Sequence, residues 1–193
     1  VPLKRGTARS AASPFRVRGD TVDTPHLAVR FAEDGSIASC VLRATGRELV
    51  RQGGALNVFW LGEDVPAAWD NWDIDRDQHL KMRPDQHLVS RKVVAAGPLQ
   101  LRLRCTYRIG TRSTLTQDLV FHAGSSRLDF ETKVDWHEKH VLFKAGFALN
   151  VTTDSARHEI QFGHVRRPTH ANQAQDRARF EVCAHKWTDL SDN

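Results

Sequence analysis

The sequence has 193 residues, which is enough for one large domain with an ordinary hydrophobic core. It carries 28 Lys and Arg residues against 23 Asp and Glu residues, a formal net charge of +5. The basic residues alternate with acidic ones, whereas a nucleic-acid footprint needs them clustered on one face, so we expect no nucleic-acid partner. No apolar run approaches the roughly 20 residues that span a bilayer, so we expect no membrane partner.

The start of the chain and the cysteines bear on the cellular compartment. The first six residues are polar and lack the apolar segment of a secretory signal peptide. Cys40, Cys105 and Cys183 are odd in number and widely spaced, and they form no C-x-x-C pair. We interpret them as reduced, buried thiols of a cytoplasmic protein.

The first part of the chain predicts a tail followed by a hairpin. Residues 1–20 are rich in Arg, Ser, Ala and Pro and are interpreted as a mobile N-terminal arm. Residues 21–193 remain for the folded domain. Strands are predicted over 27–31 and 37–42, because the Asp-Gly pair within residues 33–36 favours a tight turn between two strands.

Three longer stretches show the apolar–polar alternation of half-buried β-strands. They cover residues 99–109, 114–122 and 128–136. The polar positions carry mainly arginine in the first stretch and mainly acidic residues in the third. If these strands pair, the two faces become neighbours, which favours cross-strand ion pairs.

The rest of the chain adds shorter strands and no clear helix. We predict strands over 143–151, 160–162 and 179–186. No stretch keeps a 3.6-residue apolar period over three turns, so helix should be scarce. Many strands without helices predict an all-β fold, a large antiparallel β-sandwich.

The most distinctive local feature is the segment over residues 63–75, in which two tryptophans and three aspartates lie close together in the sequence. These are Trp69, Trp72, Asp70, Asp73 and Asp75. Indole faces stack on the apolar faces of sugar rings and carboxylates accept hydrogen bonds from hydroxyls, so this segment suits the rim of a saccharide site. Alternatively, the indoles fill the space between the sheets while the carboxylates cap a turn. Both interpretations fit the spacing.

A second candidate segment lies closer to the C-terminus. Arg166, Arg167 and His170 fall in a predicted loop, and loops on rigid scaffolds are where binding groups concentrate. An arginine there could bind hydroxyls or a carboxylate. The alternative is an interdomain salt bridge or a solvated loop.

The ten histidines do not predict a metal site. A catalytic zinc site needs three converging protein ligands, and the closest spacings are His137 with His140, and His158, His164 and His170 in series. Residues six apart on an extended strand lie about 20 Å apart, too far to share an ion. We therefore expect no metal ligand in this chain.

Four segments resemble one known family. They cover residues 63–75, 128–140, 160–172 and 178–190, and include Trp69-Asp70-Asn71-Trp72-Asp73, Trp136-His137-Glu138-Lys139-His140, Gly163-His164-Val165-Arg166-Arg167 and Ala184-His185-Lys186-Trp187. Together they resemble the C-terminal β-domain of glycoside hydrolase family 38, the zinc-dependent α-mannosidases.

The resemblance implies a galactose-mutarotase-like supersandwich, two broad curved sheets face to face. It implies a retaining parent enzyme that hydrolyses α-mannosides, whose zinc and nucleophilic aspartate belong to an N-terminal α/β barrel that is absent from this sequence. No catalytic residue is therefore assigned here. The expected role is to support the barrel, with the eight tryptophan, aspartate, arginine and histidine candidates as substrate-binding residues at the site's rim.

The resemblance also implies that this domain is truncated at both ends relative to the parent. An exposed sheet edge and an uncovered docking face predict that the chain self-associates. Two alternatives stay open. One is a free-standing carbohydrate-binding β-sandwich without catalytic activity, and the other is a mutarotase-like epimerase, which would need a His and a Glu facing one pocket.

Overall fold

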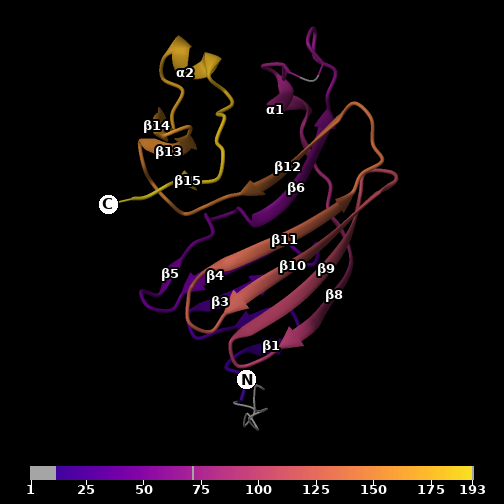
Figure 1. Ribbon diagram of the computed structural model, residues 1–193, viewed down its shortest axis with the longest axis vertical. Helices are drawn as coiled ribbons and strands as arrows, with labels where there is room; N and C mark the ends of the chain where they lie inside the picture. The colour runs from indigo at the N-terminus through magenta and orange to yellow at the C-terminus, as the bar shows by residue number, and fades with distance from the viewer. Residues whose placement is uncertain (1–11, 71, 193) are drawn as a thin grey trace, which may run out of the picture.

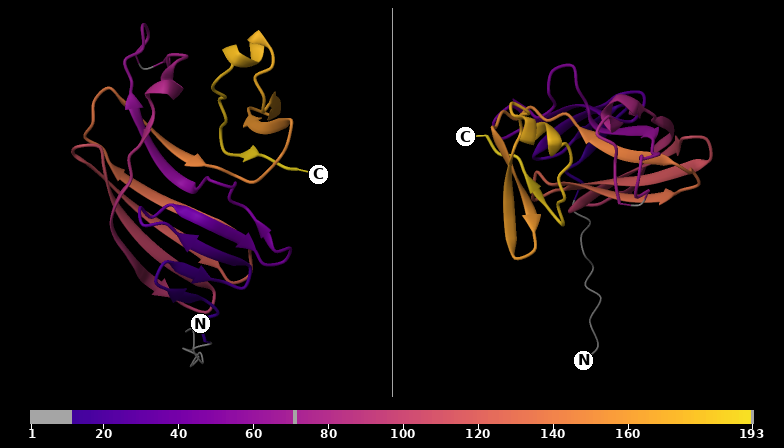
Figure 2. Two further views of the ribbon diagram at one scale, coloured as in Figure 1. Left: turned by 180° about the vertical axis from the view of Figure 1, so that it is seen from behind. Right: turned by 90° about the horizontal axis from the view of Figure 1, so that it is seen from above.

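The computed structural model describes residues 12–70 and 72–192, and its regular secondary structure is almost entirely antiparallel β-strand (Figure 1). Two large sheets face each other as a sandwich, and a small third sheet lies near the C-terminus (Figure 2). The all-β sandwich predicted from the sequence is confirmed.

The larger sheet has eight strands in the order β1-β2-β3-β4-β6-β12, with β5 beside β4 and β7 beside β6. The strands are β1 (Arg16–Arg18), β2 (Thr21–Asp23), β3 (Leu27–Phe31), β4 (Ile37–Leu42), β5 (Arg47–Glu48), β6 (Leu56–Glu63), β7 (Arg83–Pro84) and β12 (Val141–Phe147). The predicted β3–β4 hairpin turns at Gly35, which has a φ of +85°. A Cβ atom there would lie 2.8 Å from the Tyr107 hydroxyl, so glycine is required both by backbone and by space.

The facing sheet has four strands in the order β11-β10-β9-β8. They are β8 (His87–Ala96), β9 (Gln100–Ile109), β10 (Ser113–His122) and β11 (Leu128–Asp135). Alternate residues of β9 and β10 point into the sandwich and form its core with the inward side chains of β3, β4 and β6. The Phe59 and Tyr107 rings meet edge-on across the two sheets, with centroids 5.1 Å apart.

A buried polar link crosses this core. The Asn57 amide donates to Gln117 Oε1 at 2.7 Å, and the Gln117 amide donates in turn to Thr132 Oγ1 at 2.9 Å. Asn57 and Gln117 are almost fully buried, so their mutual hydrogen bonds replace those lost to water. Asn57 also adopts a φ of +60°, a conformation that asparagine tolerates better than most residues.

The C-terminal part forms a small sheet in the order β14-β13-β15. Its strands are β13 (Ser155–Ile160), β14 (Gly163–Pro168) and β15 (Thr188–Asp189), and the helices are α1 (Gln78–Lys81) before β7 and α2 (Ala174–Ala178) after β14. Ion pairs join this part to the large sheet, from Arg47 to Asp192 and from Lys144 to Glu181.

Several local predictions were wrong. Residues 161–162 form the turn between β13 and β14 instead of continuing a strand over 160–162, and residues 179–186 form no strand. The predicted mobile arm over 1–20 overlaps β1, which pairs with β2, while residues 1–11 lie outside the described part of the chain.

The prediction that all three cysteines are buried holds for two of them. Cys40 and Cys105 are buried, but Cys183 is exposed. Burial raises the pKa of the Cys40 thiol to about 11.

The predicted charge pairing across the long strands is confirmed. On the outer face of the four-stranded sheet, Asp118 of β10 accepts hydrogen bonds from Arg104 at 2.7 and 2.9 Å and from Arg102 at 3.0 Å. Arg102 also pairs with Glu131 of β11. The arginines hold the pKa of Asp118 below its usual range, chiefly through the Arg104 hydrogen bond.

Candidate functional site

The tryptophan-rich segment forms a loop that leaves the end of β6 and returns through α1. Figure 1 places this loop at the end of the sandwich opposite β1. At its start, the Asp64 N–H donates to the carbonyl of His140 at 2.8 Å, and at its end the Gln78 N–H donates to the carbonyl of Asp75 at 2.9 Å. Both ends of the loop are thus fixed by backbone hydrogen bonds.

The tip of the loop turns at Trp69, which has a φ of +60°. The Trp69 carbonyl accepts the N–H groups of Trp72 at 2.7 Å and of Asp73 at 3.0 Å. A bulky residue in the left-handed region is costly, so this turn holds Trp69 in a strained conformation. Such strain is often found at functional positions.

The loop holds its indoles in solvent. Trp69 is 75% exposed and Trp72 is 90% exposed, so neither fills the space between the sheets, and that structural alternative is wrong. Asp70 and Asp73 are also exposed, and the Asp70 carboxylate has no hydrogen bond or ion pair to another residue that the structure describes. An exposed aromatic face beside a free carboxylate is a surface that a sugar ring can bind.

Asp75 differs from the other two aspartates. Its carboxylate accepts the Ala67 N–H at 3.2 Å and lies 3.6 Å from the Lys81 ammonium of α1. It therefore closes the base of the loop, as the turn-capping interpretation predicts. The five predicted residues divide into four exposed at the tip and one that supports it.

A hollow of about 390 Å³ lies beside the base of this loop. It is lined by Leu61, Gly62, Glu63, Lys81, Gly110, Thr111, Glu138, His140 and Val141. Glu138 accepts the N–H groups of Arg112 at 2.8 Å and Thr111 at 3.0 Å, and also the Ser113 hydroxyl at 3.1 Å. These hydrogen bonds lower the pKa of Glu138 to about 2, and the one from the Arg112 N–H has the largest effect. No pattern in the sequence indicates this role of Glu138.

The second predicted group lies in a different element from the one expected. Arg166 and Arg167 belong to strand β14 and not to a loop, because β13 and β14 pair along their full length. Arg166 donates to Ser155 Oγ at 2.6 Å and to Asp154 at 3.1 Å, so it is engaged in an exposed ion pair. His170 follows β14 and lies 3.7 Å from Asp176 of α2.

The two groups do not share one site. A small hollow of about 230 Å³ runs past Asp154, Arg157 and Arg166, and it contains no residue of the tryptophan loop. Among the described residues, no hydrogen bond or ion pair joins residues 63–77 to the small sheet. The structure therefore presents two separate candidate clusters.

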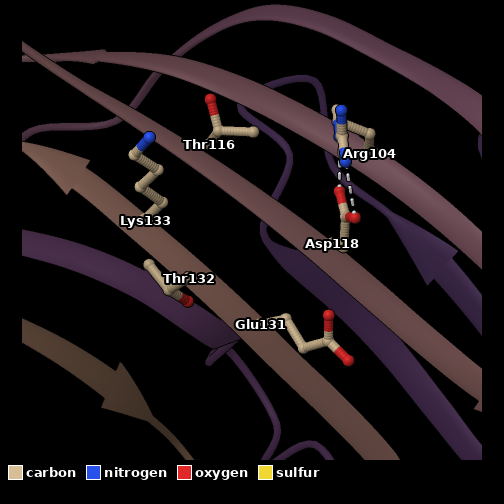
Figure 3. Close-up of a pocket in the computed structure, with 6 residues that line it drawn as sticks. All are labelled: Arg104, Thr116, Asp118, Glu131, Thr132 and Lys133. Atoms are coloured by element: carbon tan, nitrogen blue, oxygen red, sulfur yellow. Dashed lines mark hydrogen bonds and ion pairs between the residues drawn. The ribbon is translucent and has the colours of Figure 1, made fainter.

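A third hollow, of about 590 Å³, lies on the outer face of the four-stranded sheet. Figure 3 shows Asp118 facing Arg104, with Lys133 and Glu131 on the neighbouring strand. Asp118 and Glu131 are already paired with Arg102 and Arg104, and no aromatic ring lines the hollow. This face is an ion-pair network and a poor match for a sugar ring.

The described part of the chain offers no metal centre. No three His, Cys, Asp or Glu side chains in residues 12–70 and 72–192 are placed to hold a metal ion together. In the same residues, no helix is both long and apolar enough to cross a membrane.

Comparison with known proteins decides the family. Residues 22–193 match the glycosyl hydrolases family 38 C-terminal domain. The chain belongs to this family. It is 39% identical over 175 residues to alpha-mannosidase 2C1 of Homo sapiens, covering 90% of this chain and 17% of that protein. It is 34% identical over 199 residues to alpha-mannosidase G of Dictyostelium discoideum, covering 100% of this chain and 18% of that protein.

A solved structure has the same fold. An alpha-mannosidase from Enterococcus faecalis V583 superposes with a TM-score of 0.69 at 11% identity, covering 88% of this chain and 22% of that one. Family 38 C-terminal chains of this kind are parts of alpha-mannosidases, which are glycoside hydrolases. The chain spans about one sixth of the length of the curated relatives that it matches.

Proposed function

We propose that the chain is the non-catalytic β-sandwich domain of an α-mannosidase that hydrolyses α-mannosidic bonds. The observation that carries the proposal is the family match over residues 22–193, in a chain that spans only 17–18% of alpha-mannosidases from human and Dictyostelium. A domain of this size within a much longer hydrolase supports and positions the part that performs the chemistry.

The chemistry is assigned to a barrel domain outside this chain. A zinc ion bound there would grip the mannose hydroxyls, and an aspartate there would act as the nucleophile of a retaining reaction. Retaining glycosidases need two carboxyl groups about 5–5.5 Å apart, on either side of the scissile bond. The residues of this chain take no part in bond cleavage.

The tryptophan loop contributes the rim of the sugar site. In this arrangement Trp69 and Trp72 stack on the substrate, and Asp70 and Asp73 accept hydrogen bonds from its hydroxyls. Asp75 holds the loop through Ala67 and Lys81. The exposure of both indoles supports this role, since an indole in water gains most by covering an apolar face of a ligand. Arg166, Arg167 and His170 form a second, weaker candidate for contacts with substrate or barrel.

The test of the rim is made in the full-length enzyme. Asp70→Asn and Asp73→Asn should each lower kcat/KM by about ten- to a hundredfold, because one charge-assisted hydrogen bond to a sugar is worth about 1.5–3 kcal/mol. The melting temperature should stay within about 1 °C, since both carboxylates are exposed at the loop tip. Asp20→Asn, in the exposed β1–β2 turn, is the matched control and should change neither quantity.

The opposite pattern would assign the loop to structure. A fall in melting temperature with unchanged kcat/KM ends the rim role. Trp72→Ala provides a second variant, with exposed Leu99→Ala beside β9 as its control, because both remove a large exposed apolar side chain. Only the tryptophan variant should lose activity.

A free-standing carbohydrate-binding module is the second candidate. The same exposed pair, Trp69 and Trp72, favours it, since such a surface binds sugars without a catalytic partner. Calorimetric titration of the 193-residue chain with an α-mannoside separates the two functions. Binding that Trp72→Ala removes would favour the module, whereas no binding until the barrel is present favours the enzyme domain.

The location and the remaining partners are also proposals that follow from the sequence and the family resemblance. We place the protein in the cytoplasm and expect neither nucleic acid nor membrane as a partner. The isolated chain should self-associate, because end strands such as β11 and β12 have no further strand beside them among the described residues.

A further inference from the structure

The outer face of the eight-stranded sheet carries a tryptophan that belongs to neither candidate cluster. Phe59 of β6 is buried in the core, so its neighbour Trp60 points to the opposite, outer face. Trp60 lies opposite Lys144 of β12, the strand that runs beside β6 (Figure 1). The indole therefore lies on the surface of the sheet, outside the core of the sandwich.

Gly146 of β12 allows this indole to lie close against the sheet. A Cβ atom at Gly146 would be 2.8 Å from Trp60 Nε1 and 3.3 Å from Trp60 Cδ1, so a larger residue would push the ring away. Among the described residues, none accepts a hydrogen bond from the Trp60 N–H, and solvent reaches this nitrogen. The N–H of a partly buried indole usually has a partner. This one is an open donor that a ligand can use.

A hollow of about 550 Å³ opens beside the indole, a volume within the usual range of small-molecule sites. The turn over residues 51–54 forms one wall, because the Arg51 N–H donates to the carbonyl of Ala148 at 2.8 Å. A Cβ atom at Gly54 would lie 2.6 Å from the Ala148 Cβ, so only glycine lets the turn pack this closely. The lining consists of Arg51, Gly53, Gly54, Ala55, Val58, Trp60, Gly146, Phe147 and Ala148.

The polar side chains around this hollow are donors without acceptors. They are the Arg51 guanidinium and the Trp60 N–H, and both groups only donate. The three hollows described above each include carboxylates, whereas the lining of this one includes none. Arg51 is exposed, and its guanidinium pairs with no carboxylate that the structure describes. A ligand must therefore supply the acceptors, which favours an anionic group over a set of neutral hydroxyls.

We propose that this hollow binds a monosaccharide with a negative charge, a pyranose that carries a phosphate or a carboxylate group. The apolar face of the pyranose stacks on the Trp60 indole. The anionic oxygens accept hydrogen bonds from the Arg51 guanidinium, whose planar fork matches phosphate and carboxylate alike. The choice of a sugar ring rests on the proposed function, that the chain is a domain of an enzyme that acts on α-mannosides.

This site is separate from the tryptophan loop. Trp60 precedes Glu63, the last residue of β6, by three positions, which places it about 10 Å along the strand from the start of the loop. No described residue between 64 and 77 lines the hollow. The charged sugar is therefore bound in addition to the α-mannoside at the rim.

Calorimetric titration of the full-length enzyme with small probes tests the site. Mannose 6-phosphate should bind at least about tenfold more tightly than inorganic phosphate, and mannose should show no binding that depends on Arg51, because only the sugar phosphate offers both ring and anion. Glucuronate distinguishes the two sources of charge, since the tighter of the two charged sugars identifies the anionic group. Phenyl phosphate tests whether the ring must be a sugar.

Three variants locate the binding. Arg51→Gln should weaken mannose 6-phosphate binding by about ten- to a hundredfold, because charge-assisted hydrogen bonds are lost. Trp60→Phe keeps an aromatic ring without the N–H and should weaken binding by about threefold. Arg16→Gln, on exposed β1 at the other end of the sheet, is the matched control for Arg51 and should leave binding unchanged. Arg51→Gln should keep the parent's melting temperature and its kcat/KM for an aryl α-mannoside.

Several results would overturn the inference. Equal affinities of Arg51→Gln and Arg16→Gln show that Arg51 holds no anion. Inorganic phosphate that binds as tightly as mannose 6-phosphate shows that no ring is recognised, and phenyl phosphate that binds more tightly than both charged sugars shows that the ring is not a sugar. Loss of binding in Asp70→Asn places the ligand at the tryptophan loop.

The two remaining outcomes separate this site from its surroundings. Binding to the 193-residue chain that is absent from the full-length enzyme shows that another part of the polypeptide covers the hollow, and it also overturns the inference. By contrast, a full-length protein that does not hydrolyse α-mannosides removes the proposed function, while binding of a charged sugar that depends on Arg51 still supports this site.

Discussion

Glu138 fastens the β9–β10 turn to the segment that leads into β12. Gly110 permits this contact, since its φ is +60° and a Cβ atom there would lie 2.8 Å from the Glu138 carboxyl carbon. The carboxylate accepts two backbone N–H groups and two hydroxyls in this turn. One charged residue therefore holds the floor of the hollow beside the tryptophan loop.

The Glu138 contacts predict a pH-dependent stability. Because the folded pKa is lowered from 4.5 to about 2, the contribution of this group is full above pH 4.5 and is lost as pH falls toward 2. Glu138→Gln should therefore melt at a lower temperature than the parent at pH 7, and the difference should vanish near pH 2. Thermal melts from pH 2 to 7 measure this, with nearby exposed Glu63→Gln as control. A difference that is independent of pH would contradict the prediction.

Asp118 is the most interior charge of the outer ion-pair network. Only 7% of its side chain is exposed, whereas Arg104 is 43% exposed. Asp118→Asn should destabilise the chain by about 1.5–3 kcal/mol, because hydrogen bonds to a charged group are lost. On the same sheet face, Asp135→Asn breaks an exposed pair with His137 and should cost less than about 1 kcal/mol. Urea denaturation of both variants compares the two, and equal losses would contradict the assignment.

At the scale of elements, β6 connects the core to the site. It pairs with β4, β7 and β12, and its far end begins the tryptophan loop. Near its other end, Asn57 is bonded to Gln117 of β10 across the sandwich. This strand therefore fixes the loop relative to both sheets.

The amide pair predicts strong coupling between the sheets. Asn57→Ala should cost about 2–4 kcal/mol, since it leaves the buried Gln117 Oε1 without its donor and places alanine at a positive φ. Asn57→Gly removes the backbone strain and isolates the hydrogen-bond part. The double variant Asn57→Ala with Gln117→Leu should lose less than the sum of the single variants in a double-mutant cycle. Additive losses would show that the amides act independently.

Strands with one buried and one solvent-exposed face could be predicted from the sequence, whereas strands that lack this alternation could not. The segments that became β3, β9, β10 and β11 alternate cleanly, so their bounds were predicted within one or two residues. β6 (Leu56–Glu63) was not predicted, because adjacent apolar residues occupy both of its faces. β8 was not predicted either, because two register shifts break its apolar–polar alternation. The pair Arg166-Arg167 suggested a loop, yet both faces of the small sheet are open enough for arginines within a strand.

The candidate site shows the same limit. Sequence composition located the tryptophan loop but left open whether the indoles were core or surface. That choice depends on where β6 ends relative to the facing sheet, which is a tertiary property. The role of Glu138 depends on the β9–β10 turn some 27 residues earlier in the chain, and local pattern carries no such information.

At the scale of the whole molecule, we predict that catalysis and zinc binding belong to the barrel domain and not to this chain. The purified 193-residue chain should neither hydrolyse an aryl α-mannoside nor retain zinc in a stoichiometric amount after dialysis. The reason is that no three convergent ligand side chains were found in its described residues, and a catalytic site needs three. Metal analysis and a chromogenic assay check this, with the intact enzyme as positive control. Turnover by the chain that a chelator abolishes would refute the proposed assignment.

The exposure of the two indoles at the loop tip also makes the loop optically distinct. The chain has five tryptophans, and Trp69 and Trp72 are far more exposed than Trp136 at 37% and Trp187 at 44%. Their emission is therefore the long-wavelength component of the intrinsic fluorescence and the one that acrylamide quenches first. Docking of a barrel or a sugar onto this loop would shift that component to shorter wavelength and shield it from the quencher, so the protein carries its own reporter of when the rim is occupied.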